Sequence, residues 1–192
     1  MIPGTDPRAS AQARLLRESA PLLLRFLEGF NEGNRAVQAP SLPNHPIWIL
    51  GHCAFTMARL AEVLGGPHPA ASDFATGPRS GVAGPVDRFF IEDVAKDSTP
   101  SPDASRYPSL ARGRAIFVSA VEAIATTVER MPPSKLDGTL DWGGTQHAVV
   151  SIINRVAIHN GIHAGQLTDL RRALGFALIL PITPPSPQPA RV

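Results

Sequence analysis

The spacing of the prolines constrains the fold of this chain more than any other feature of its sequence. The 192 residues include 20 prolines, about twice the usual ~5% share. Most of them fall into five groups, at residues 3–7, 40–46, 67–108, 132–133 and 181–189. Because proline interrupts helices and strands alike, long regular elements have to lie between these groups. Four long stretches with few prolines remain.

Each of these stretches repeats apolar residues at steps of three and four, which is the period of an amphipathic helix. The predicted helices cover about residues 10–31, 46–64, 109–131 and 145–174. Pro21 is expected to kink or divide the first helix. Thr145 is expected to cap the fourth, and Gly65 and Gly175 to end the second and the fourth. Since no stretch shows the alternation of a strand, the sequence predicts an all-α four-helix bundle.

The length of the chain fits one domain, predicted to span residues 1–180 and to be followed by a proline-rich tail at 181–192. The connection between the second and third helices, about residues 65–108, is rich in Gly, Pro, Ser and Asp. A connection of this length in a compact domain is usually functional or carries short elements of its own. It is therefore a candidate lid or specificity loop.

The charge, the hydropathy and the cysteine content limit the kinds of partner, location and metal site that the chain can have. The net charge is only +2 and no run of basic residues occurs, so a nucleic-acid partner is not expected. We find no secretion signal at the N-terminus and no apolar stretch of membrane-spanning length, so we expect a cytoplasmic protein without a membrane partner. The lone Cys53 excludes an intrachain disulfide and a cysteine-based zinc cluster, and its predicted role is a small buried thiol.

Three histidines are the candidate metal ligands. His159 and His163 are four residues apart on the apolar side of the fourth predicted helix, so both rings should point into the bundle. This spacing lets one helix offer two nitrogens to one metal ion. His52, in the almost wholly apolar second helix, is the candidate for the third ligand. Histidines that form hydrogen bonds within the core would fit the same pattern, and this alternative stays open.

The other histidines are given different roles. His45, His68 and His147 are predicted to be surface or capping residues, because they lie at a helix entrance, in a Pro-Gly loop and in the first turn of the fourth helix. A metalloprotease of the zincin type is not expected, since Asn160 follows His159 where that motif has Glu.

Four further residues are candidates for the surroundings of the metal. Asn160 and Gln166 are expected to face inward beside the histidines and to orient them. Trp48 and Phe55 flank His52 on its helix and are expected to line a pocket there. No catalytic residue is assigned.

Two segments resemble a known family. HNGIHAGQLTDLRRALG (159–175) is similar to the last-helix signature of the DinB/YfiT-like metalloenzymes, and LPNHPIWILGHCAFTMARL (42–60) resembles their second-helix signature. The resemblance implies a four-helix bundle that binds a divalent metal through His52, His159 and His163, often as a homodimer. It also implies thiol-dependent chemistry, with a low-molecular-weight thiol as a further cofactor. Asn160 departs from the family, where Glu is common.

Two classes of function follow. In the first, the protein is a metal-dependent enzyme acting on a small-molecule substrate, as a thiol-dependent S-transferase or a related hydrolase, because an open metal position lowers the pKa of a bound thiol or water. In the second, it is a non-catalytic metal- or ligand-binding helical bundle. Imidazole ligands suit zinc, nickel, copper and iron alike. We expect zinc or nickel first, with iron or manganese as the next candidates.

Overall fold

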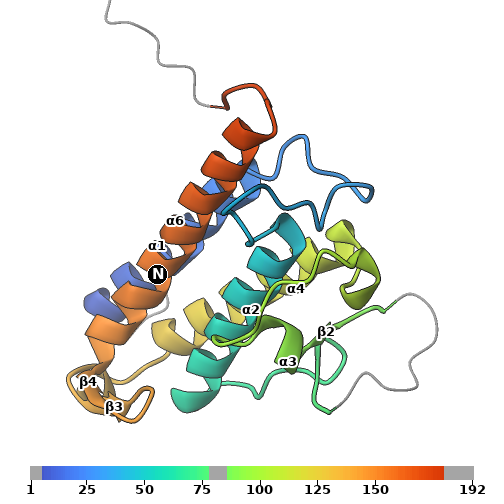
Figure 1. Cartoon of the computed structure of the whole chain (residues 1–192). Coiled ribbons are helices and arrows are strands. Elements are labelled where there is room, and N and C mark those ends of the chain that lie inside the picture. Colours follow the sequence, from blue (N-terminus) through green and yellow to red (C-terminus); the bar gives the residue numbers. More distant parts are fainter. Residues whose placement is uncertain (1–5, 78–85, 180–192) are drawn as a thin grey trace, which may run out of the picture.

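The computed structural model describes residues 6–77 and 86–179 and is mainly helical (Figure 1). Its long helices are α1 (Pro7–Arg25), α2 (Pro46–Val63), α4 (Leu110–Glu129) and α6 (Val149–Ala173). They lie where the spacing of apolar residues predicts helices. None of the described helices is long and apolar enough to cross a membrane. The predicted proline-rich tail, residues 181–192, lies outside the described residues.

Short elements fill the connections. Two are helices of one turn, α3 (Ile91–Val94) and α5 (Pro133–Leu136), and a 3-10 turn covers Ala104–Arg106. The strands β1 (Phe74–Ala75) and β2 (Phe89–Phe90) pair in parallel, and β3 (Thr139–Asp141) and β4 (Gln146–Ala148) pair antiparallel. The sequence did not predict these strands, because two or three residues are too few to show an alternating pattern.

Two predicted helix boundaries are wrong. α1 continues through Pro21 to Arg25 and then ends in turns, so the proline does not divide it. α6 begins at Val149 rather than near Thr145, whose carbonyl instead accepts a hydrogen bond from the Trp142 amide in the β3–β4 hairpin. The Gly143-Gly144 pair allows this tight turn, since both residues have a positive φ.

The long helices share one core. α4 packs against both α1 and α2, while α6 packs mainly against α1 and also meets α2. Fully buried side chains from each of them interdigitate, among them Leu16, Leu50, Phe117 and Leu167. The contact between α2 and α6 matters for function, because the three candidate ligands come from these two helices.

In the connection between α2 and α4, the described residues around β1, β2 and α3 pack on α2 (Figure 1). As predicted, the connection carries elements of its own, β1, β2 and α3. Phe89 and Val94 are fully buried against α2. They approach so closely at Gly51 that a Cβ atom there would lie 2.7 Å from both side chains. Gly51 therefore lets the connection reach the helix position next to His52.

Candidate metal centre

The three predicted histidines meet at one point between α2 and α6. The Nε2 atom of His159 lies 3.2 Å from Nε2 of His52 and 3.1 Å from Nε2 of His163. One ligand atom from each residue lies within 4.8 Å of the others. The helical spacing explains the pair on α6, because residues four apart lie above one another on one face.

The spacing of these nitrogens suits a metal ion. Ligand nitrogens placed ~2.0–2.1 Å from a tetrahedral zinc are about 3.3 Å apart. The two Nε2 separations, 3.2 and 3.1 Å, are close to that value. The same separations are also within hydrogen-bond range. Which ring nitrogens carry protons therefore decides between a metal site and a cluster of hydrogen-bonded histidines.

Carbonyl partners define the protonation of two rings. His52 Nδ1 lies 2.8 Å from the carbonyl oxygen of Val94, and His163 Nδ1 lies 2.8 Å from Oε1 of Gln166. A carbonyl oxygen only accepts hydrogen bonds, so each Nδ1 carries the proton and each Nε2 keeps a lone pair in the neutral ring. Both lone pairs point toward Nε2 of His159. Outer hydrogen bonds of this kind orient metal-binding histidines in proteins.

The hydrogen bonding of His159 favours a metal ion over a hydrogen-bonded cluster. Its Nδ1 is buried without a hydrogen-bond partner among the described residues. A proton on His159 Nε2 would have to be shared between the lone pairs of His52 and His163, whereas one cation would satisfy all three nitrogens. The donor set, three neutral imidazoles, also suits a divalent ion of the zinc type. The residues present therefore fit a metal ion.

Burial keeps these rings neutral. Desolvation, followed by repulsion from His163 and His52, lowers the pKa of His159 to about 3. Desolvation, with a smaller effect of His52, lowers the pKa of His163 to about 4. Burial also lowers the pKa of His52. The lone pairs that a metal needs are consequently available at neutral pH.

Trp48 holds the plane of His52. The two rings stack with centroids 4.6 Å apart and an interplanar angle of 8°, and the Trp48 ring meets His163 edge-on at 5.9 Å. Its indole Nε1 donates a hydrogen bond to Ser98 Oγ in the connection. Trp48 thus lies against two of the three histidines, and its place in a substrate pocket stays a prediction.

Phe55 lies differently from the prediction. Its ring contact in the described part of the chain is with Phe74 of β1, at a centroid distance of 5.4 Å. Phe55 therefore helps to hold the connection on α2 rather than lining a pocket at the histidines.

Of the two residues on α6 that were predicted to orient the histidines, Gln166 contacts one of them and Asn160 does not. Gln166 accepts a hydrogen bond from His163, and the side-chain amide of Asn44 donates to the same Gln166 oxygen at 2.9 Å. Asn160 is fully buried but directed elsewhere, since its Nδ2 donates to Ser19 Oγ on α1 at 2.9 Å. Adjacent helix positions point about 100° apart. This angle turns Asn160 away from the face that carries His159.

His45 is a capping residue, as predicted, but it does not lie on the surface. Its Nδ1 accepts the amide N–H of Trp48 at the start of α2, and its Nε2 donates to the Ser101 carbonyl at 2.9 Å. The ring is fully buried beneath the connection, with Tyr107 against it. Burial lowers the pKa of His45 to about 4.

The remaining candidates lie outside the centre. His68 is exposed and contacts Glu62 at 2.6 Å, as expected for a surface residue. His147 lies in β4, before the first turn of α6 rather than within it. Cys53 is fully buried, and burial raises the pKa of its thiol, which agrees with the predicted structural role.

The groups that approach the histidines from outside α2 and α6 were not predicted from the sequence. They are the Val94 carbonyl, the Asn44 amide and the Ser98 hydroxyl. A backbone carbonyl has no signature in the sequence. The length of the connection was the available signal, because it supplies both Val94 and Ser98.

Replacement of Gly51 by alanine is expected to disturb the centre through the connection. The added Cβ would press on Phe89 and Val94, and such overpacking typically costs about 1–3 kcal/mol of stability. Moving Val94 also weakens its hydrogen bond to His52, and loss of such an outer partner lowers metal affinity by roughly 10–100-fold. Denaturant unfolding and metal titration measure the two effects.

Gly165→Ala on α6 is the matched control, since a Cβ there meets no atom within 4 Å. Alanine favours a helix over glycine by up to about 1 kcal/mol, so this variant should be at least as stable as the wild type. Equal behaviour of the two variants would contradict the role given to Gly51.

Comparisons with known proteins agree with this arrangement. A model of the DinB superfamily matches residues 15–167. The fold is similar to a crystal structure of a conserved protein from Enterococcus faecalis, with a TM-score of 0.64 and 14% identity over 86% of this chain and 96% of that one. No curated protein matches the chain. Because the family model covers most of the chain and includes all three histidines, this protein belongs to the DinB superfamily.

Proposed function

We propose that this protein is a divalent-metal-dependent enzyme, in the first place a thiol-dependent S-transferase, whose metal is held by His52, His159 and His163. The proposal places this site in a four-helix bundle formed by α1, α2, α4 and α6. The observation that carries it is the convergence of three Nε2 atoms, two of which keep their lone pairs because Val94 and Gln166 accept the Nδ1 protons.

The chain's own residues have defined parts in this chemistry. A divalent ion held by three neutral imidazoles supplies positive charge and lowers the pKa of a bound thiol or water. Val94 and Gln166 keep the protons on the far nitrogens, and Trp48 covers one face of His52. Among the described residues no carboxylate forms a hydrogen bond with these histidines, so protons would leave through solvent.

Two alternatives remain within the proposal. A metal-dependent hydrolase would use water in place of the thiol, and a non-catalytic metal- or ligand-binding bundle would use the same three histidines. Zinc or nickel is the expected ion, followed by iron or manganese. We expect a small-molecule substrate and a cytoplasmic location, for which the single buried Cys53 is suitable.

The test compares two reactions with one set of proteins. Metal-free protein is loaded with zinc or nickel and mixed with low-molecular-weight thiols and chlorodinitrobenzene, and in parallel with p-nitrophenyl acetate. Conjugation that is lost in His159→Ala and retained in His147→Ala supports the transferase. Ester hydrolysis with the same dependence supports the hydrolase. Metal binding without either activity supports the binding protein.

We further propose a homodimer that forms through one apolar face of α1 and α6. Leu15, Leu22, Ile158 and Ile162 are 42%, 43%, 61% and 57% exposed, and a groove of about 220 Å³ lies between the two helices. Exposed apolar patches of this kind mark interfaces between proteins.

Light scattering at micromolar concentration should therefore give the mass of a dimer for the wild type and of a monomer for Ile158→Glu. Val118→Glu, at an exposed apolar position on α4, is the control and should remain dimeric. A monomeric wild type would contradict the proposal.

A further inference from the structure

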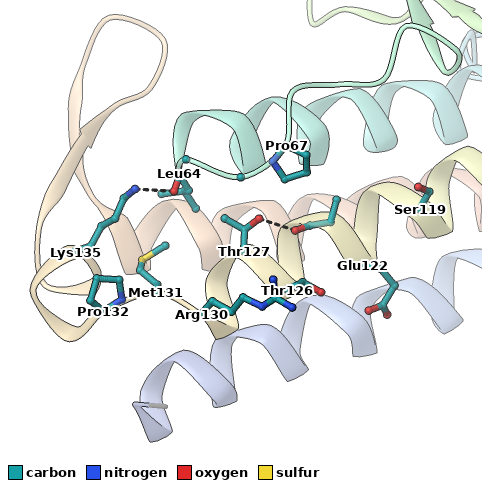
Figure 2. Close-up of a pocket in the computed structure, with 13 residues that line it drawn as sticks. Leu64, Pro67, Ser119, Glu122, Thr126, Thr127, Arg130, Met131, Pro132 and Lys135 are labelled. Atoms are coloured by element: carbon teal, nitrogen blue, oxygen red, sulfur yellow. Dashed lines mark hydrogen bonds between the residues drawn. The ribbon is translucent and has the colours of Figure 1, made fainter. Parts of the chain in front are cut away.

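A second cavity lies away from the histidines. It has a volume of about 860 Å³ and opens between the turn that follows α2 and the face of α4 (Figure 2). Leu64, at its edge, is twelve residues beyond His52, which corresponds to about 18 Å along α2. The cavity is in the size range of small-molecule sites. Its walls include no site histidine.

The charged groups at one end of the cavity favour an anion. Lys135 donates one hydrogen bond to the Leu64 carbonyl at 2.6 Å (Figure 2), which leaves two of its protons free. The guanidinium of Arg130 has no hydrogen-bond or ion-pair partner within residues 6–77 and 86–179, whereas its backbone amide donates to Thr126 in the last turn of α4. Glu122, the carboxylate among the lining residues, already pairs with Arg17, which lies outside the cavity wall. Arg130 and Lys135 therefore outnumber the carboxylate of the wall by one positive charge.

Helix capping accounts for only part of this arrangement. Cations at helix C-termini interact favourably with the last carbonyls, and Lys135 does so at the end of α2. Arg130 is the C-cap residue of α4, yet its guanidinium donates to none of the described carbonyls. Its five N–H groups are therefore available to a ligand.

A smaller, mainly apolar cavity of about 180 Å³ adjoins the first. The two have Pro67, Ser119 and Ala123 in common, and the smaller one is lined further on by Phe74 and Ile116. Its lining also includes Asp73 and His68, which are already paired with Arg112 and Glu62. The two cavities together offer a cationic end and an apolar end along the same side of α4. This arrangement matches a molecule that has a single charged group and a hydrocarbon body.

We propose that these adjoining cavities together bind a small amphipathic carboxylate. The carboxylate lies between Arg130 and Lys135, where the planar guanidinium matches its two oxygens. The hydrocarbon body passes Ala123 and ends against Phe74. The site is independent of the metal, and the proposal stands whether or not the histidines support catalysis.

Octanoate and octanol, which share a chain but differ in charge, provide the test. Titration of ¹⁵N-labelled protein with octanoate should shift the amide signals of Gly65, Gly66 and Thr126, with at least about tenfold weaker binding of octanol. Arg130→Gln should remove this difference, and Ala123→Leu, which fills the shared wall, should weaken both ligands. Arg155→Gln, an exposed position on α6, is the control and should bind as the wild type does.

Three results would overturn the proposal. Equal binding of octanoate and octanol would show that the cations serve only the helix ends. Unchanged binding in Arg130→Gln would do the same. Shifts confined to the face of Leu15 and Ile158 would place the ligand in the apolar groove of α1 and α6 instead.

Discussion

Replacement of His163 by alanine should abolish stoichiometric metal binding and leave a folded helical protein. His163 supplies one of three convergent Nε2 atoms, and its own orientation depends on the hydrogen bond from Nδ1 to Gln166. Loss of an outer partner alone costs roughly 10–100-fold in affinity, so loss of a ligand should exceed about 100-fold. Two histidines without His163 offer a divalent ion an incomplete site.

The measurement is the metal content after removal of metal and reloading with one equivalent of zinc, in protein purified without a nickel column. Circular dichroism verifies that the helices are intact. His147→Ala is the matched control, because that residue lies in β4 outside the centre. A full equivalent of zinc in the His163→Ala protein would assign the metal to other ligands.

The metal-free protein should lose stability steeply as the pH falls below about 6.5. A histidine that is buried and neutral has a lower pKa in the folded state than the ordinary 6.5, so the unfolded chain binds more protons between the two values. The stabilisation is complete at a pH above the histidine's pKa in the unfolded chain. It is lost as the pH falls toward the histidine's pKa in the folded protein. For His45, with a folded pKa of about 4, this linkage amounts to about 2 kcal/mol between pH 7 and pH 5.

His45→Asn isolates that contribution. Asparagine is a good helix cap but does not titrate, and the site histidines contribute equally to both proteins. Urea unfolding of metal-free protein at pH 7 and pH 5 should show that the wild type loses about 2 kcal/mol more than the variant. Parallel losses in the two proteins would mean that His45 is accessible to protons in the folded state.

The long helices and the convergence of the three histidines were predictable because their signals repeat along the chain. Apolar residues at steps of three and four marked α2, α4 and α6, and the same period placed His159 and His163 on one inward face. His52 was predicted from the apolar character of α2 and from the resemblance of its segment to a family signature. A pattern of this kind reports which face of a helix is buried.

The same pattern does not report which neighbour a buried residue meets. Asn160 is inward-facing, as predicted, but its partner is Ser19 of α1 rather than a histidine. His45 was expected to be a surface or capping residue at the entrance of the helix, and nothing in its own segment indicates that residues 101–107 fold over it. The Val94 carbonyl escaped prediction for the same reason, since the contact depends on the path of a connection without periodic structure.

Local opening of the connection that packs on α2 is coupled to the occupancy of the metal site. His45 donates to the carbonyl of Ser101, and the hydroxyl of Tyr107 accepts the amide N–H of the same residue, so this backbone is held from two sides. Seven residues earlier, Val94 accepts the His52 proton. An opened connection would leave His52 free to change its tautomer and would lower its affinity for an ion. By reciprocity, an ion bound at the three histidines makes such openings less frequent. The hydrogen-exchange rates of the slowest amides in the connection should therefore decrease when the site is occupied, although these amides do not contact the ion.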